Sequence, residues 1–135
     1  MVAWEQLLIG RKVTLVESWE GCPCVLHLTD GYRLQIESLW RLRRDGIVVL
    51  TSHDDGHSFA APASGNAIEK LCAALVGLEL QHVSAHSGTS DLTLEMGRAA
   101  LQVVSDSSGY EAWQAEGPDG TLAVGQGGGN VVVWN

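Results

Sequence analysis

The sequence predicts an α+β domain that is mostly antiparallel β, built from two tandem divergent repeats that share one core. Three observations support this class. Apolar residues alternate with a period of two in many short segments, which is typical of half-buried strands. A count of 16 glycines in 135 residues indicates many turns rather than long helices. The same series of landmarks occurs twice along the chain, which indicates an internal repeat.

The landmarks of the repeat occur in the same order in each half. An apolar segment ends in a glycine, two alternating strands flank a turn glycine, and a tryptophan precedes an Asp-Gly turn and a further strand. The first copy supplies Gly10, Gly31, Trp40 and Asp45-Gly46, and the second supplies Gly77, Gly97, Trp113 and Asp119-Gly120. We expect two helix-plus-β-meander units related by one pseudo-two-fold axis. The alternative is a single meander whose hairpins are alike only because hairpins generally are.

The chain is expected to form a single domain, 1–135, with an internal division. The first copy covers 1–51, and the second covers 66–135 and includes an extra strand at its end. Between them, 52–65 has little periodicity and several turn-forming residues, which predicts an exposed connector.

Each copy is expected to begin with a helix. In the second copy, apolar residues recur every three or four positions over 68–76. Asn66 and Glu69 have the spacing of a capping box, and Gly77 is placed to stop the helix. The first copy has a shorter equivalent whose inward-facing residues are expected to be Trp4, Leu7 and Leu8.

Eight to ten antiparallel strands are expected, with Asp-Gly dipeptides at several of their turns. A last strand at 131–134 should pair with the strand at 122–124. The alternation predicts these core-facing residues: Leu26, Leu28, Leu34, Ile36, Val48 and Leu50 in the first copy, and Leu92, Leu94, Met96, Leu101, Val103, Leu122 and Val124 in the second.

The formal net charge of −8 bears on the choice of partner. An acidic chain repels nucleic-acid phosphates and anionic membranes, and it attracts basic partners. We therefore expect neither nucleic acid nor membrane as a partner. The alternative is that the acidity only maintains solubility.

Cys22, Cys24 and Cys72 make an odd count, and the first residues do not resemble a signal peptide. These features predict a cytoplasmic protein without a disulfide framework. Cys22, Cys24 and His27 are the weak candidates for a metal site, because their spacing is not typical of zinc knuckles. We expect no metal and no cofactor.

No nucleophile elbow, cysteine–histidine signature or phosphate-binding loop occurs in the sequence, so an enzyme is not expected. The glycine-rich stretch 125–130 lacks the lysine and the following helix of a phosphate loop, and it predicts a hairpin turn. The polar group around Asp54 and Asp55 is better explained as a solvated loop than as an acid–base cluster.

The arginines 41, 43 and 44 form a basic cluster on an otherwise acidic chain, and alternation places Arg41 and Arg43 on one face of a strand. This face either binds an anionic partner or is simply solvated. Trp40 and Trp113 are either buried or line an interface. The candidate partner-binding residues are Trp19, Trp40, Arg41, Arg43, Arg44, Asp54 and Asp55, with Trp19 and Trp40 as exposed anchors.

Several short segments resemble a known family. They are 8–13 (Leu-Ile-Gly-Arg-Lys-Val), 34–42 (Leu-Gln-Ile-Glu-Ser-Leu-Trp-Arg-Leu), 111–113 (Glu-Ala-Trp) and 117–120 (Gly-Pro-Asp-Gly). With these segments the chain resembles the DUF6188 family of small bacterial, mainly actinobacterial, proteins of unknown function. The resemblance implies no catalytic residues. In general character the chain is also similar to bacterial immunity proteins.

These observations predict a non-enzymatic bacterial protein that binds another protein. The most specific form is an immunity protein that neutralises a basic toxin domain through an acidic surface, because complementary charge speeds association. One alternative is a small-ligand-binding or enzymatic domain with its site between the repeats. Another is a structural homodimer that pairs through its last strand. The sequence leaves open whether the protein is a monomer or a homodimer.

Overall fold

The computed structural model describes residues 3–54 and 66–134, whose strands form two antiparallel sheets. The six-stranded sheet has the order β1-β2-β3-β9-β10-β11, and these strands span Val13–Trp19, Cys22–Leu28, Arg33–Ile36, Trp113–Gly117, Gly120–Gly125 and Val131–Val133. The five-stranded sheet has the order β5-β4-β8-β7-β6, and these strands span Ile47–Thr51, Leu39–Arg44, Ala99–Val104, Leu92–Met96 and His82–Ala85. Two helices complete the described residues, α1 (Trp4–Leu8) and α2 (Ala67–Leu75), with a 3₁₀ turn at Thr29–Gly31. The mostly antiparallel α+β class is confirmed, with one strand more than the upper figure expected.

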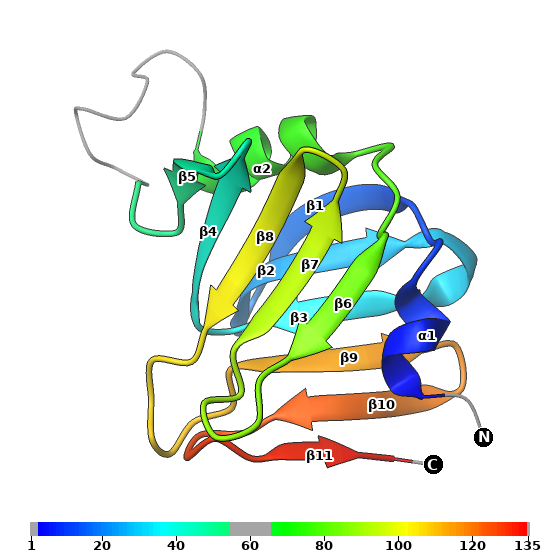
Figure 1. Ribbon diagram of the computed structural model, residues 1–135, viewed down its shortest axis with the longest axis vertical. Coiled ribbons are helices and arrows are strands. Elements are labelled where there is room, and N and C mark those ends of the chain that lie inside the picture. The colour runs from blue at the N-terminus through cyan, green and yellow to red at the C-terminus, as the bar shows by residue number, and fades with distance from the viewer. Residues whose placement is uncertain (1–2, 55–65, 135) are drawn as a thin grey trace.

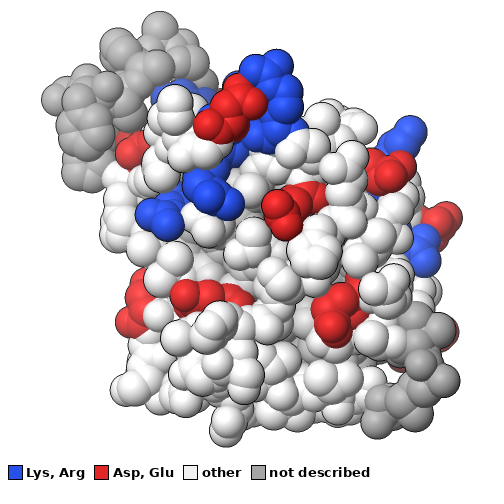
Figure 2. All heavy atoms as spheres, in the orientation of Figure 1, with Lys and Arg blue, Asp and Glu red and all other residues white. Residues whose placement is uncertain are grey.

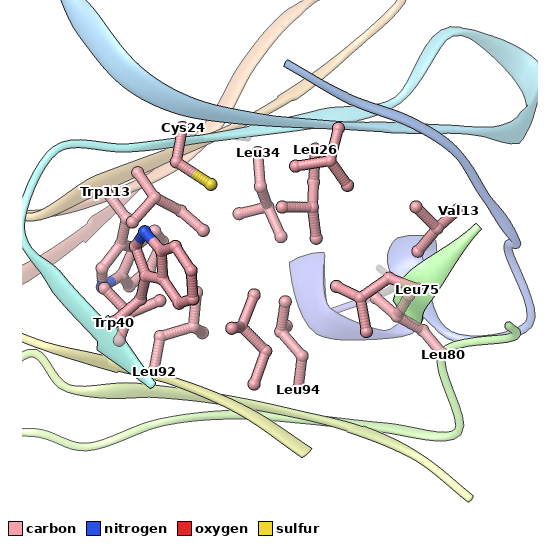
Figure 3. Close-up of a cluster of buried hydrophobic side chains, with 14 of the residues drawn as sticks. Val13, Cys24, Leu26, Leu34, Trp40, Leu75, Leu80, Leu92, Leu94 and Trp113 are labelled. Atoms are coloured by element: carbon pink, nitrogen blue, oxygen red, sulfur yellow. The ribbon is translucent and has the colours of Figure 1, made fainter. Parts of the chain in front are cut away.

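The two sheets pack face to face with their strands running across one another (Figure 1). Side chains from both inner faces meet in one core, to which Leu26 and Leu34 of the six-stranded sheet and Leu92 and Leu94 of the five-stranded sheet contribute (Figure 3). The helices lie at the margins of this sandwich: α2 packs on β1, and α1 packs on β6. One continuous core therefore joins both halves of the chain.

The chain crosses between the sheets twice. After β3 it leaves the six-stranded sheet to form the β4–β5 hairpin in the five-stranded sheet. After β8 it returns to form β9, β10 and β11. At the centre of one sheet β3 pairs with β9, with Ile36 opposite Trp113. At the centre of the other β4 pairs with β8, with Trp40 opposite Val103. Neither sheet can be completed from one half of the chain alone.

The segments that leave the two helices also lie together, with Lys12 opposite Glu79 in an antiparallel bridge. Four backbone hydrogen bonds join them: Gly10 N–H to Leu80 O (2.7 Å), Gly77 N–H to Val13 O (2.8 Å), Val13 N–H to Leu78 O (2.9 Å) and Leu80 N–H to Arg11 O (2.9 Å). The glycine in each of these two segments adopts a positive φ, +92° at Gly10 and +91° at Gly77. This conformation favours glycine because it has no side chain. The bridge lies a few residues beyond the end of each helix.

Helix α2 begins as the sequence predicts. The Asn66 side-chain oxygen accepts a hydrogen bond from Glu69 N–H at 2.8 Å, as an N-cap residue does. Leu71 and Leu75 are fully buried. The expectation that Val76 belongs to the apolar face is wrong, because the helix ends at Leu75 and Val76 is 47% exposed.

The predicted core-facing pattern fails in part at two strands that follow Asp-Gly turns. Val48 is 45% exposed, because it lies on an edge strand and the β4–β5 register shifts between Leu42 and Arg43. Leu50 is the residue of β5 that reaches the core. Leu122 packs against the core as predicted but is only half-buried, and the register of β10 shifts just before Ala123. Bulges of this kind change which residues point inward, and alternation cannot reveal them.

The pairing of β11 with β10 is confirmed, with Val132 opposite Val124. The turn between them packs against the loop that precedes β7. There Ser90 is fully buried, its hydroxyl donates to Gln126 O (2.9 Å), and its carbonyl accepts from the Trp113 indole N–H (2.7 Å). The glycine-rich stretch is therefore a hairpin turn that helps to enclose Trp113.

Candidate binding surfaces

The predicted partner-binding residues do not converge on one surface. Trp19 lies on the outer face of the six-stranded sheet at 37% exposure, beside the outward-facing His27. Arg41 and Arg43 lie on the outer face of the five-stranded sheet, as alternation predicts. Because the two sheets form the two layers of a sandwich, these outer faces point away from each other.

Trp40 is only 2% exposed and lies in the core (Figure 3). The expectation that it is an exposed anchor is wrong. Successive side chains of a strand point to opposite faces of the sheet. Because Arg41 of β4 points outward, the neighbouring indole of Trp40 points inward. Trp113 is also buried, and its ring stacks on that of Trp4 with the ring centres 5.3 Å apart. Both tryptophans of the proposed repeat are core residues.

Around Trp19 the outer face of the six-stranded sheet carries a network of charged side chains. Glu17 accepts from the Trp19 indole N–H at 3.0 Å, and its carboxylate lies 2.6 Å from His27 Nε2. These hydrogen bonds, first from Trp19 and then from His27, lower the pKa of Glu17. Arg33 lies over the Trp19 ring at 5.3 Å and bonds Glu116 at 2.9 Å. The charges here are largely compensated by one another.

The arginine cluster divides by position along β4. Arg41 donates from Nε to Gln102 at 2.7 Å. Arg43 is half-buried, and its Nε has no hydrogen-bond partner among the described residues. Arg44 is exposed at the end of the strand, where the neighbouring Asp45 is paired with Arg98. The Arg98 guanidinium holds the pKa of Asp45 below its usual value.

Asp54 has a local role in the turn that follows β5. Its carboxylate accepts from Thr51 N–H at 2.9 Å and from the Thr51 hydroxyl at 3.2 Å. This interaction closes the turn and engages the carboxylate within it. Asp55, like most of the predicted connector, lies outside the described residues.

The weak metal candidates do not come together. Cys22 and Cys24 are buried in β2, whereas His27 lies on the opposite, outer face of the same strand. Burial raises the pKa of the Cys22 thiol, and it raises that of Cys24 to about 12. In residues 3–54 and 66–134 no group of three or more histidine, cysteine or acidic side chains is placed to hold a metal ion.

A polar hollow of about 330 Å³ lies on the outer face of the five-stranded sheet. It is lined by side chains of β4, β6, β7 and β8 and of the loop before β7, among them Arg41, His86, Asp91, Thr93 and Gln102. Figure 2 shows this face of the molecule, with Lys and Arg gathered toward one end of the sheet. The hollow is open, and both signs of charge line it.

A second depression, of about 390 Å³, is lined by Gly21, Pro23, Glu37, Asp106, Ser107, Tyr110 and Glu111. We call it the acidic hollow, because the described residues that line it include three carboxylates and neither lysine nor arginine. The pKa of Glu37 is raised, first by partial desolvation and then by repulsion from Glu111. Tyr110, at its rim, is 81% exposed. An uncompensated acidic surface beside an exposed aromatic ring is suited to contact with a basic protein.

Sequence reasoning missed the acidic hollow. Glu37 follows β3, and Asp106 and Glu111 follow β8, so the residues are far apart in the chain. Pairing of β3 with β9 brings the two connections together, with Glu37 N–H donating to Ala112 O at 2.9 Å. The signal present in the sequence is that acidic residues follow two separate strands, Glu37 after β3 and Asp106 after β8.

The chain belongs to the DUF6188 family of proteins of unknown function, whose model matches residues 4–135. No curated protein matches the chain, and no solved structure matches it. Among the described residues, neither helix has the length and apolar character needed to cross a membrane.

Proposed function

We propose that this protein is a non-enzymatic binding protein that engages a basic partner protein through the acidic hollow. One observation carries the proposal: Glu37, Asp106 and Glu111 converge, and no lysine or arginine occurs among the residues that the structure describes around them in the lining. Elsewhere several carboxylates are paired, as Asp30 is with Arg11 and Asp45 with Arg98. An unpaired acidic cluster keeps its field available to steer a basic partner.

The rim of the acidic hollow supports the same proposal. Tyr110 combines an apolar ring with a polar hydroxyl and is 81% exposed. Tyrosine is among the residues that most often contribute large shares of binding energy at interfaces. The carboxylates would then accelerate association, and the ring would slow dissociation.

The non-enzymatic part of the proposal is supported by the state of the reactive side chains. Cys22 and Cys24 are buried thiols whose raised pKa disfavours the nucleophilic thiolate. His27 is engaged with the carboxylate of Glu17 on the outer sheet face. None of these three residues lines the acidic hollow.

The test is a triple variant, Glu37→Gln, Asp106→Asn and Glu111→Gln, used beside the wild-type chain as bait in the native host. Its matched control carries Glu79→Gln, Glu95→Gln and Asp119→Asn, which change the charge equally at exposed positions elsewhere. Wild type and control should retain the same basic protein, identified by mass spectrometry, and the triple variant should lose it. Equal recovery with all three baits would overturn the proposal.

The most specific form of the proposal is an immunity protein that neutralises a toxin. It rests on the acidic surface and predicts a basic toxin domain encoded beside this gene. Co-expression with that domain should rescue growth, and the triple variant should not. Rescue by the triple variant would contradict the role of the acidic hollow, and failure of the wild type to rescue would exclude immunity.

A small-ligand-binding function is the second candidate, and the polar hollow favours it. Arg41 uses its Nε on Gln102, and Asp91 accepts Ser105 N–H at one carboxylate oxygen, Oδ1. The hollow therefore suits a small polar molecule with an anionic group for Arg41 and a donor for Asp91. Native mass spectrometry of the purified chain should detect such a molecule, with loss in Arg41→Gln but not in Arg44→Gln. A wild-type spectrum without added mass would exclude it.

We also propose that the chain is a tandem duplication with a pseudo-two-fold axis near Lys12 and Glu79. The hydrogen bond from Gly10 N–H to Leu80 O has its counterpart in the bond from Gly77 N–H to Val13 O. The sheet orders support the same relation, because β3–β9 pairing in one sheet corresponds to β8–β4 pairing in the other. The axis would make β11 an addition to the second copy. Superposition of the two halves of an experimental structure tests this proposal, and halves that do not superpose would overturn it.

A further inference from the structure

β11 is an edge strand with little to block further pairing. Among the described residues, α2 packs on β1 and contacts β5, and α1 packs on β6, whereas β11 packs mainly on β10. Residues 121–135 contain no charged side chain, and the lower part of Figure 2, where β11 lies in Figure 1, is neither blue nor red. Proteins usually protect such edges with charges, prolines or a covering element.

The hydrogen bonds of β11 to β10 determine which of its backbone groups point outward. Trp134 N–H donates to Leu122 O at 2.9 Å, and Asn130 O accepts from Gln126 N–H at 2.8 Å. Val132 lies opposite Val124 between them. Because an antiparallel ladder alternates its direction, the N–H and C=O groups of residues 131 and 133 face away from the sheet.

We propose that β11 pairs antiparallel with β11 of a second copy of this chain, about a two-fold axis at Val132. This register lets the N–H and C=O of Val131 bond those of Val133 in the second copy, and the reverse. Val132 then faces its own counterpart as a non-hydrogen-bonded pair. The six-stranded sheets of two copies become one continuous sheet.

The side chains on β11 suit pairing with a second copy of the chain. Val133 is 44% exposed and Trp134 is 50% exposed, and pairing covers part of both. Because β11 carries no charged side chain, no like charges meet across the two-fold axis when two copies pair. The contact is small, so the dimer exchanges with monomer in solution. This surface shares no residue with the acidic hollow, and its test is independent of the proposed function.

The first experiment measures mass by sedimentation velocity over about a hundredfold range of concentration, since dimerisation follows mass action. Val132→Lys places like charges opposite each other at the axis and should weaken the dimer by at least about tenfold. Val48→Lys, on the exposed edge strand β5, is the matched control and should dimerise as the wild type does. A wild-type chain that stays monomeric overturns the proposal, as does a Val132→Lys variant that dimerises normally.

The second experiment stays informative if Val132→Lys fails to fold. In a Cys72→Ala background, Val132→Cys should form a disulfide-linked dimer on mild oxidation. A non-hydrogen-bonded pair has Cα atoms about 4.5 Å apart, within the range of a disulfide. Val48→Cys is the control and should remain monomeric. Absence of the link at 132, or equal linking at 48, shows that β11 does not pair with itself.

Discussion

At the scale of single residues, the surroundings of Trp113 leave no room at Gly125. A Cβ atom added to Gly125 would overlap the indole of Trp113, including the Nε1 that donates to Ser90 O. The indole is fully buried and stacked on Trp4, so it has little freedom to move. Glycine at this position is therefore a requirement of packing.

Gly125→Ala should lower the free energy of unfolding by about 1–3 kcal/mol, the usual range for an overpacked core. Urea unfolding followed by tryptophan fluorescence measures the change. Gly109→Ala is the control, because its added Cβ would meet nothing within 4 Å. An alanine at 125 as stable as the wild type would mean that the Trp113 ring can shift.

The buried thiol of Cys24 makes stability depend on alkaline pH. Its pKa is raised to about 12, mainly by burial, so the folded state favours the neutral thiol. Below about pH 9 the thiol is neutral in both states, and stability is unaffected. Above about pH 9 the unfolded chain ionises first, and stability falls by up to about 1.4 kcal/mol per pH unit until the folded pKa.

Urea unfolding between pH 8 and the alkaline limit of the protein tests this expectation. Cys24→Ala is less stable at every pH because it leaves a cavity, yet its stability should fall less steeply with pH. Equal slopes in the two chains would show that Cys24 ionises as readily in the folded state as in the unfolded state.

At the scale of elements, the cap of α2 is a local feature with a measurable energy. The Asn66 side chain accepts from Glu69 N–H at 2.8 Å, which satisfies one free donor of the first helical turn. Asn66→Ala should cost about 1 kcal/mol of stability. Asn66→Asp keeps an acceptor and is the control, expected to stay close to the wild type. Thermal unfolding compares the three chains, and an unchanged melting temperature in Asn66→Ala would contradict the role of the cap.

Local features of this kind were predictable from the sequence. The cap at Asn66, the hairpins at Asp45-Gly46 and Asp119-Gly120 and the pairing of β11 with β10 all depend on residues close together in the chain. Sheet membership was not predictable, because a period of two identifies a strand without indicating its neighbours. The burial of Trp40 has the same cause, since alternation gives two faces and leaves open which is inward.

The acidic hollow shows the corresponding limit for a site. Glu37 and Glu111 are ordinary acidic residues in two separate connections, and only the β3–β9 pairing brings those connections together. Residue type makes Trp19 and Arg41 candidates for binding, yet they lie on opposite layers of the sandwich. Which loops lie together depends on where the chain crosses between the sheets, and the sequence does not indicate those crossings.

At the scale of the whole molecule, each sheet contains strands from both halves of the chain. This strand pairing should hold the two halves together even when the chain between them is cut. A specific protease site placed within residues 55–65 allows the test. After cleavage the two pieces should co-elute in gel filtration with an unchanged circular dichroism spectrum, because β3–β9 and β4–β8 still join them. A chain with a scrambled site, treated identically, is the control. Pieces that elute separately under native conditions would contradict this account.

The crossing of the chain after β3 also bears on how the protein folds as the ribosome makes it. When the residues up to 51 have left the ribosome, the β4–β5 hairpin can form, but β8, the strand with which β4 pairs, has not yet emerged. Trp40 and Leu42 on the inner face of the hairpin can then pack only on β1, β2 and β3, because the other strands of the opposing sheet belong to the second half of the chain. Pairings between distant segments form slowly and leave apolar surface open to aggregation. Slower translation of residues 66–104 should therefore prolong the interval in which the nascent chain depends on chaperones.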